Sequence, residues 1–399
     1  MRQIFGSICI VLIIYTPALF AVTGNSHLSS EVYSFKQDSI KHLQFYQALQ
    51  SRFILSQQGK KKIDFSTYAR WRTDLENKST TDPQLFVYDL QLNFKEVISS
   101  TQLSIGRQFR YSSIGSDLLD GVSIKTSFIP QSELSVYVGS NVNRLEPDKI
   151  QNLTENLSAG GYYKYKFSPN FASALNWFLK KEDDRISSHR LGIDANAKLA
   201  KISLYSRVSY DVALLSFNEF LVRGNYNYEK WQIGLEGRYR EPNVNTNSVF
   251  SIIESKKYKR LRSDIQFKLN RTVRLVTQLR YLIYEDGNST SGLIGIRGSH
   301  FSLFYNYQTG RGSENNGVSG TVSHKLDKVT SLYASANLAR YHIQEEYDEL
   351  SDAYSAAIGG VRTFAGSWQV RGEWQYLRNA IESYSSRIYF RLSKQFSIR

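Results

Sequence analysis

The sequence predicts an all-β protein, a transmembrane antiparallel up-and-down β-barrel of about 20 strands, with 18 or 16 strands as the alternatives. Three observations support this fold class: a period-two alternation of apolar and polar residues, a sorting of short and long connections, and aromatic residues at both ends of the alternating segments. Together they predict a barrel at residues 61–399, preceded by a signal peptide at residues 1–24 and a non-barrel arm at residues 25–60.

Residues 1–24 have the layout of a secretory signal peptide. Arg2 precedes an apolar run at residues 4–14, which is short for a membrane-spanning helix, and small or mixed residues follow. The single cysteine of the chain, Cys9, lies within this leader. The mature chain is therefore expected to form no disulfide, no cysteine-ligated metal site and no CxxCH haem attachment.

Residues 25–60 do not follow the period-two pattern. A basic run of three lysines follows at residues 60–62, and the apolar positions before it are irregularly spaced: Val32, Phe35, Ile40, Leu43 and Phe53. We expect a loose helix or extended arm here, which serves either as a periplasmic tail or as a plug that enters the barrel.

From residue 63 onward the dominant period is two, the pattern of strands with one apolar and one polar face. Alternating segments of about 9 to 13 residues return roughly every 17 residues, whereas strands of soluble proteins cluster near five or six. The longer segments match tilted strands that cross a bilayer.

The segment WQIGLEGRYR, residues 231–240, illustrates the consequence of this pattern. Ile233 and Leu235 suit lipid, while Glu236 and Arg238 suit water. Only a closed sheet satisfies both faces, because an open edge in hydrocarbon leaves backbone groups unpaired at a cost of several kcal/mol each.

The connections are sorted by length, counting strands from the segment that begins at residue 63. Those after even-numbered strands are tight, for example Glu229 with Lys230. Those after odd-numbered strands are longer, including Asn141 to Asn156, Lys181 to His189 and Glu241 to Lys259. Short turns at one rim and long loops at the other are typical of outer-membrane barrels. The first and last of these loops are the longest, and we expect them to fold inward and narrow the bore.

Aromatic residues are expected at both rims, where rings with one polar edge prefer the two membrane interfaces. The long-loop end of the strands holds Trp71, Tyr111, Trp177, Tyr210, Tyr239, Tyr281, Tyr307 and Trp374. The short-turn end holds Phe94, Phe128, Phe167, Phe171, Tyr228, Trp231, Phe301, Trp368 and Phe396.

The stretch LSIGRQFRYSSIGSDLLDGVSIK, residues 103–125, resembles a hairpin of Gram-negative outer-membrane β-barrel porins and of porin-like exporters of the alginate-export type. There a G-R-Q ends one strand and a D-G-V opens the next; here these are residues 106–108 and 120–122.

The C-terminal SRIYFRLSKQF also looks like the last-strand signal that the barrel assembly machinery recognises. It departs from that signal at Lys394, an outward position, and in the residues that follow Phe396. The resemblance implies a bacterial outer membrane, with lipid and lipopolysaccharide around the barrel.

The formal net charge is +14, and the polar strand faces carry most of the arginines. The predicted pore-lining residues are Arg70, Arg72, Arg110, Arg207, Arg223, Arg238, Arg240, Arg262, Arg274, Arg280, Arg297, Arg371 and Arg391. The inward acids are fewer: Asp64, Asp74, Asp89, Asp194, Asp211, Glu219, Glu236, Asp264 and Glu373. We therefore expect a porin-like channel whose positive lumen passes anionic small solutes or acidic oligosaccharides by diffusion. The competing explanation is that the arginines pair with acids on neighbouring strands, as Arg371, Glu373 and Arg391 are placed to do.

Three other functions compete with a channel. A barrel of this width could be a scaffold that sheathes a partner such as a multihaem cytochrome, in an electron conduit across the outer membrane. Enzymatic activity, a metal site and a cofactor are not expected, because the six histidines are scattered over the chain. Nucleic-acid binding is not expected either, because the positive residues are spread along a periodic face. The sequence leaves open a homo-oligomer or a periplasmic partner.

Overall fold

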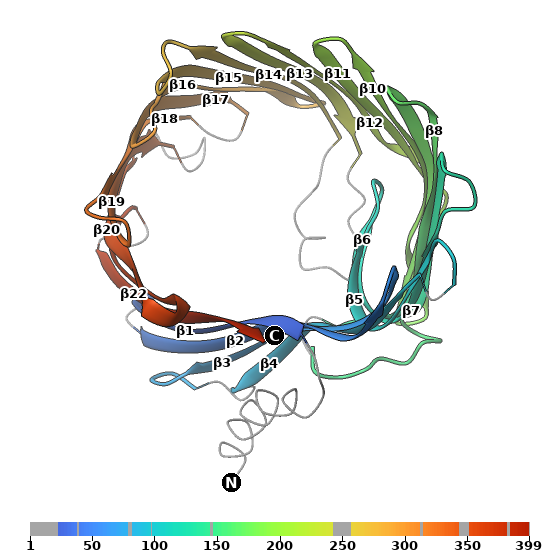
Figure 1. Ribbon diagram of the computed structural model, residues 1–399. Helices are drawn as coiled ribbons and strands as arrows, with labels where there is room; N and C mark the ends of the chain where they lie inside the picture. The colour runs from blue at the N-terminus through green and yellow to red at the C-terminus, as the bar shows by residue number, and fades with distance from the viewer. Residues whose placement is uncertain are drawn as a thin grey trace.

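The computed structural model shows one closed sheet of 22 antiparallel strands (Figure 1). It describes residues 23–37, 40–78, 82–96, 98–143, 147–241, 257–311, 314–342, 351–380 and 384–398. Neighbours in the sheet follow chain order, and β1 closes the barrel by pairing with both β2 and β22. The all-β barrel expected from the sequence is confirmed, with two strands more than the count of about 20.

The strands are long, as crossing a bilayer requires. Their bounds are β1 Thr23–Gln37, β2 Ile40–Gln58, β3 Lys61–Asp74, β4 Gln84–Lys95, β5 Thr101–Tyr111, β6 Ser116–Thr126, β7 Ser132–Asn141, β8 Leu157–Ser168, β9 Phe171–Glu182, β10 Arg185–Leu199, β11 Ile202–Asp211, β12 Ser216–Tyr228, β13 Trp231–Arg240, β14 Tyr258–Lys268, β15 Arg274–Tyr284, β16 Gly287–Arg297, β17 Phe301–Gly310, β18 Asn315–Lys325, β19 Thr330–Tyr341, β20 Ser351–Phe364, β21 Trp368–Arg378 and β22 Ser385–Ile398. A short 3-10 turn, Ala365–Ser367, joins β20 to β21.

The arm expected at residues 25–60 is wrong, because this segment forms β1 and β2 of the wall. The twenty strands from residue 61 onward agree with the sequence count, so the arm accounts for the whole difference. Alternation is obscured here because β1 presents Tyr33 and Phe35 on the same side as Glu31, so its two faces differ little in polarity. Thr23 and Gly24, assigned to the signal peptide, already belong to β1, and the rest of that segment lies outside the described residues.

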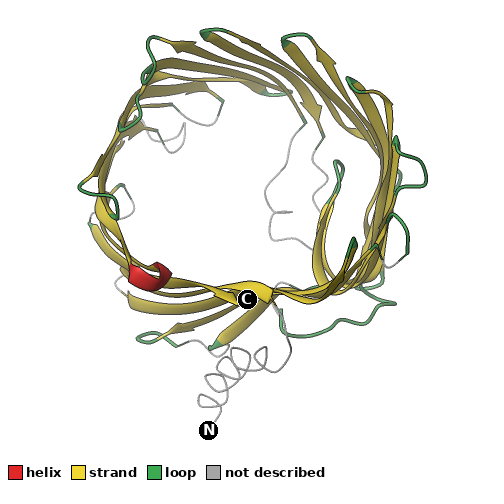
Figure 2. Cartoon of the chain, viewed as in Figure 1, coloured by secondary structure: helices red, strands yellow, loops and turns green. Residues whose placement is uncertain are grey.

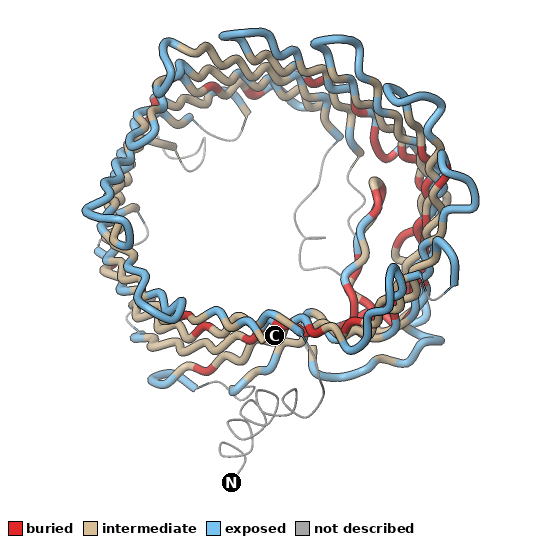
Figure 3. The backbone as a smooth tube through the Cα atoms, in the orientation of Figure 1, coloured by how far each residue is buried: buried red, intermediate tan, exposed pale blue. Residues whose placement is uncertain are grey.

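Strand β13 shows how the wall satisfies lipid and water together. Leu235 is 59% exposed on the outer face, whereas its neighbour Glu236 is 5% exposed and ion-paired on the other face. Apolar side chains of the adjoining strands continue the outer belt, including Leu261 of β14 and Leu279 of β15. Buried residues gather at one side of the barrel, around β5 to β9 (Figure 3).

Aromatic contacts mark both rims of the belt. At the short-turn end, the ring centroids of Trp231 and Phe267 are 4.5 Å apart, and the Lys394 ammonium lies 4.8 Å from the Trp368 ring. At the long-loop end, the Tyr210 and Phe217 centroids are 5.3 Å apart. A closed antiparallel barrel with an apolar belt between aromatic rims is the architecture of bacterial outer-membrane proteins, and this chain is such a barrel.

Connection lengths follow the expected sorting only in part, because short connections occur after strands of both parities. Connections after even-numbered strands run from two residues, at 59–60, to five, at 96–100. Those after odd-numbered strands range from two residues, at 38–39, 183–184 and 285–286, to seventeen, at 241–257. The long loop expected at Lys181 to His189 is wrong, because β9 and β10 continue through it to a two-residue turn at 183–184.

The β5–β6 hairpin leaves the wall halfway along its length. Strand β5 pairs with β4 only as far as the Arg107–Leu90 pair, although β5 and β6 stay paired to the end of the hairpin. Gly106 has a φ of +118°, and a Cβ atom there would lie 2.2 Å from the Leu90 carbonyl oxygen, so this bend requires glycine. The free half of the hairpin turns into the lumen (Figures 1 and 2). Tyr111, expected in the outer aromatic rim, lies on this inserted half.

Candidate functional site

The inserted tip of the β5–β6 hairpin, residues 112–115, is held against the inner wall. Ile114 is buried with Leu119, Tyr137 and Phe178 in a small apolar core. A Cβ atom on Gly192 of β10 would lie 2.3 Å from the Ile114 side chain, so the absence of a side chain there makes room for the tip.

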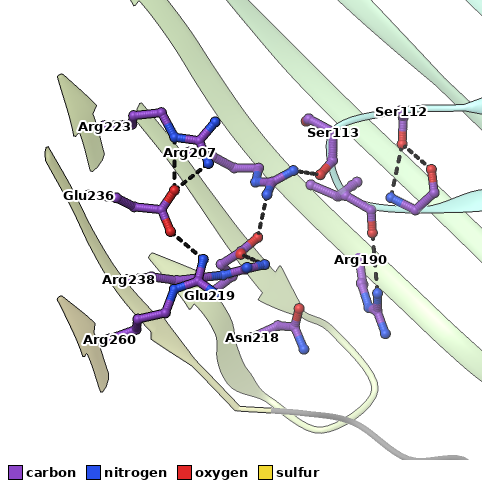
Figure 4. Close-up of polar contacts among 12 residues, drawn as sticks. Ser112, Ser113, Arg190, Arg207, Asn218, Glu219, Arg223, Glu236, Arg238 and Arg260 are labelled. Carbon is purple, nitrogen blue, oxygen red and sulfur yellow. Dashed lines mark hydrogen bonds and ion pairs between the residues drawn. The ribbon is translucent and has the colours of Figure 1, made fainter. Parts of the chain in front are cut away.

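Two arginines of the wall hold the tip by its backbone. Arg190 of β10 donates to the carbonyl oxygen of Ile114 at 3.2 Å, and Arg207 of β11 donates to that of Ser113 (Figure 4). Both guanidinium groups therefore point into the lumen. The hairpin is fixed at its base by the bend and at its tip by these contacts.

The register of the sheet decides which other side chains share this inner face. Residues directly opposite one another on neighbouring strands point to the same side of a sheet. Followed from strand to strand, the side of Arg207 holds eleven more of the predicted arginines: Arg70, Arg72, Arg223, Arg238, Arg240, Arg262, Arg274, Arg280, Arg297, Arg371 and Arg391. Arg110 lies on the hairpin, where it donates to Gln108 and Ser123.

Four arginines and two glutamates of β11 to β14 form what we call the β11–β14 cluster: Arg207, Glu219, Arg223, Glu236, Arg238 and Arg260 (Figure 4). Glu219 pairs with Arg207 at 2.9 Å and with Arg238. Glu236 pairs with Arg223 and Arg260. Each glutamate is shared by two arginines, so the cluster keeps two positive charges in excess beside the hairpin tip.

A second group lies where the barrel closes. Glu31 of β1 is 3.5 Å from Arg391 of β22 and 3.8 Å from Arg70 of β3. Arg371 pairs with Glu373 at 2.7 Å, as the sequence suggested. Arg391 pairs instead with Glu31, which sequence reasoning missed because that residue was assigned to the arm.

A third group, which we call the basic arc, lines β14 to β16 and consists of Arg262, Arg274, Arg280 and Arg297. Arg274 stands directly opposite Arg297, and Arg262 opposite Arg280. Asp264 lies 2.8 Å from Arg262. Within the described part of the chain, the other three make no ion pair. Partial pairing and excess positive charge therefore occur together in this lumen, in different sectors.

The remaining two predicted arginines lie near the long-loop end. Arg72 of β3 donates to Gln84 and lies 5.7 Å from the centre of the Phe86 ring. Arg240 ends β13 and stands opposite Glu219.

Of the two loops expected to narrow the bore, the first lies outside the lumen where the structure describes it. In the loop from Asn141 to Asn156, the carbonyl oxygens of Pro147 and Lys149 accept from Arg107. Its described residues 147–156 run along the outer side of the wall near β4 and β7 (Figure 1). Most of the loop from Glu241 to Lys259, residues 242–256, lies outside the described residues. Among the described residues, the element that enters the lumen is the β5–β6 hairpin, which has only four turn residues.

The sequence did contain a signal for this hairpin, in the G-R-Q and D-G-V motifs. Gly106 stands opposite Gly121, and Arg107 opposite Asp120. Arg107 and Asp120 form an ion pair at 2.6 Å, and the Gln108 amide donates to the Gly121 carbonyl oxygen at 3.0 Å. The motifs therefore lie at the bend and brace it.

Within the described residues, no group of three or more histidine, cysteine or carboxylate side chains is placed to hold a metal ion. The same part of the chain contains no helix with the length and apolar character needed to span a membrane. Of the six histidines, His42 lies 2.7 Å from the carboxylate of Asp74, and His342 lies 3.8 Å from that of Glu314.

Comparisons with known proteins gave similarity of structure only. No family model and no curated protein sequence matches the chain. Among solved structures, Acinetobacter baumannii OccAB3 is 9% identical, with a TM-score of 0.47 over 94% of this chain and 99% of that one. OccAB2 of the same organism is 9% identical, with a TM-score of 0.48 over 95% and 98%. Pseudomonas aeruginosa OpdQ is 10% identical, with a TM-score of 0.43 over 95% and 99%.

Proposed function

We propose that this protein is an outer-membrane channel through which anionic small solutes or acidic oligosaccharides diffuse. The observation that carries the proposal is the arginine lining, in which twelve predicted arginines share the inner face of a closed barrel. The short turns would face the periplasm and the long loops the exterior, with lipid and lipopolysaccharide around the belt.

The distribution of the charge favours anions. A low-dielectric wall lined mainly by one sign of charge concentrates ions of the opposite sign. Pairing reduces this effect in the β11–β14 cluster, but each pair of arginines there shares one glutamate. The basic arc adds Arg274, Arg280 and Arg297, which have no carboxylate partner in the described part of the chain. A carboxylate in transit could accept paired hydrogen bonds from such guanidinium groups.

The inserted hairpin favours selective diffusion rather than free passage through a wide, unobstructed pore. Barrels of 22 strands are broad enough to need a plug or constriction. Here the hairpin occupies part of the lumen, and its tip is bonded to Arg190 and Arg207. A solute passing the tip meets the β11–β14 cluster on the same side of the bore.

The same hairpin is evidence against the alternative function, in which the barrel sheathes a multihaem cytochrome. A sheath needs an unobstructed lumen for its partner polypeptide, whereas Ile114 and Leu119 are buried against the inner wall and keep the hairpin inside. We therefore favour the channel.

Planar-bilayer recordings in a KCl gradient test the proposal. The reversal potential is expected to show preference for chloride over potassium. Replacing three residues of the basic arc, Arg274→Gln, Arg280→Gln and Arg297→Gln, is expected to reduce that preference. The matched control is Arg340→Gln, which removes a positive charge on the outer face near the rim. A channel that prefers potassium would refute the proposal.

A further inference from the structure

The hydrogen-bonded wall is interrupted beside β4. This strand pairs with β3 up to Gln84 but with β5 only up to Leu90. Among the described residues, no strand pairs with residues 85–89 on the β5 side. Five residues extend about 17 Å along the strand at about 3.4 Å each, which is about 13 Å along the membrane normal at a strand tilt of about 40°. Unpaired backbone at that depth is costly, so the interruption is not a neutral feature of the wall.

A single arginine bridges the interruption. Arg107 of β5 is 6% exposed and donates to the Val87 carbonyl oxygen on the free edge of β4 at 3.3 Å. The same guanidinium bonds the carbonyl oxygens of Pro147 and Lys149 in the β7–β8 loop, and Asp120 neutralises its charge. The Arg107 guanidinium thus ties the loop to the free edge of β4 across the outside of the gap.

The two sides of the gap differ sharply in polarity. Leu85, Leu90 and Ile105 are exposed on the lipid side. On the lumen side, a cavity of about 650 Å³ is lined by polar residues of both edges, among them Gln91 of β4 and Arg110 of β5. Apolar side chains thus surround an entrance that the Arg107–Asp120 ion pair crosses, and the entrance leads to a polar, partly basic cavity. This arrangement matches a molecule with an acyl chain and an anionic head.

The hairpin offers apolar surface inside the barrel next to this cavity. Phe109 is 61% exposed and Tyr111 is 71% exposed on the inserted half of β5. In a straight strand these positions would face lipid, since they continue the face of Leu103 and Ile105. The bend that opens the gap therefore also carries lipid-compatible side chains inward.

We propose that the interruption between β4 and β5 is a lateral portal, through which the acyl chain of an anionic amphiphile passes between the surrounding lipid and the lumen. The portal is closed by residues 147–149 of the β7–β8 loop and opens when Arg107 releases them. It is a route separate from diffusion along the barrel axis and does not depend on the ion preference of the channel.

Fluorescence quenching by lipid tests the portal. A bimane label is attached at Gln91→Cys, on the inner wall beside the gap, in vesicles of phosphatidylglycerol that carry a nitroxide on the acyl chain. Labelling is specific once Cys9 is replaced by serine, because the chain has no other cysteine. The matched control is Ser291→Cys, on the inner face of the fully paired strand β16. Quenching at this position measures the effect of lipid nitroxides across an uninterrupted wall.

Quenching at position 91 is expected to exceed that at position 291 several-fold. Arg107→Ala is expected to increase it further, while Arg107→Lys, which keeps a donor, leaves it nearer the parent value. Equal quenching at the two positions in properly folded barrels would overturn the portal. Folding is checked by heat-modifiable migration on gels. Since the readout is fluorescence, failure of the portal leaves the ion selectivity of the channel untouched.

Discussion

Gly106 of β5 faces the carbonyl oxygen of Leu90 in β4 so closely that a Cβ atom would lie 2.2 Å from it. With a φ of +118°, this position suits glycine alone. Gly106→Ala is therefore expected to lower the free energy of unfolding by about 3 kcal/mol, the upper range for backbone strain of this kind. Urea unfolding of the reconstituted barrel measures the change.

The matched control for that substitution is Gly372→Ala in β21. A Cβ atom at Gly372 meets no heavy atom within 4 Å, and its φ is ordinary. The control should change stability by less than about 1 kcal/mol, and it should leave the conductance unchanged. A Gly106→Ala protein as stable as this control would contradict the assignment of the bend.

The tip contacts give a second prediction. Arg190→Ala with Arg207→Ala removes both side-chain contacts to the carbonyl oxygens of Ile114 and Ser113. The tip is then expected to move in and out of the bore, which raises the open-channel current noise in single-channel recordings. Arg223→Ala is the control, because it removes a positive charge from the same cluster without touching the hairpin. Noise that stays at the parent level in the double variant would show that the apolar core alone holds the tip.

Most of the wall could be predicted from the sequence because its strands have one apolar and one polar face. Leu235 and Glu236 differ in polarity and lie on opposite faces, so the period of two is visible without a structure. In β1 the signal fails, since Tyr33 and Phe35 face inward and Ser30 and Ser34 face outward. The pairing of such a strand with its neighbours, here β2 and β22, is seen only in the tertiary structure.

The arginine lining was predictable from the same period, but its pairing was not. Arg371 and Glu373 lie two residues apart on one strand face, and their ion pair could be anticipated. The partner of Arg391 is Glu31, more than three hundred residues away, and depends on closure of the barrel. The insertion of the hairpin was missed for a related reason. The residue at which β5 stops pairing with β4 depends on both strands and is not visible in the sequence of either one.

A third prediction concerns the buried carboxylate of Glu236. Glu236→Gln leaves Arg223 and Arg260 without their shared negative charge. The substitution is expected to increase the chloride preference of the channel and to cost about 2 kcal/mol of stability, since hydrogen bonds to charged groups contribute about 1.5 to 3 kcal/mol. Reversal potentials and urea unfolding measure the two effects. Asp352→Asn, in the exposed pair with Arg340, is the control and should change stability by less than about 1 kcal/mol.

A fourth prediction follows from the role of β1 in closing the barrel. A chain that lacks residues 23–58 loses β1 and β2, so β22 and β3 are left as open edges. Unpaired edges in hydrocarbon cost several kcal/mol for each group, and the shortened chain is expected not to fold. Heat-modifiable migration and protease resistance report folding. A folded, protease-resistant product would mean that this segment is a dispensable arm after all.

A fifth prediction separates charge from size as the origin of selectivity. If guanidinium groups such as Arg280 and Arg297 attract anions through the aqueous bore, salt must screen them. The Debye length is about 10 Å at 0.1 M salt and about 3 Å at 1 M. Chloride preference is therefore expected to be strong in gradients near 0.1 M and to fall markedly near 1 M, with the basic-arc triple variant showing a smaller fall. A preference that does not change with salt would point instead to the geometry of the constriction, because a steric filter is not screened.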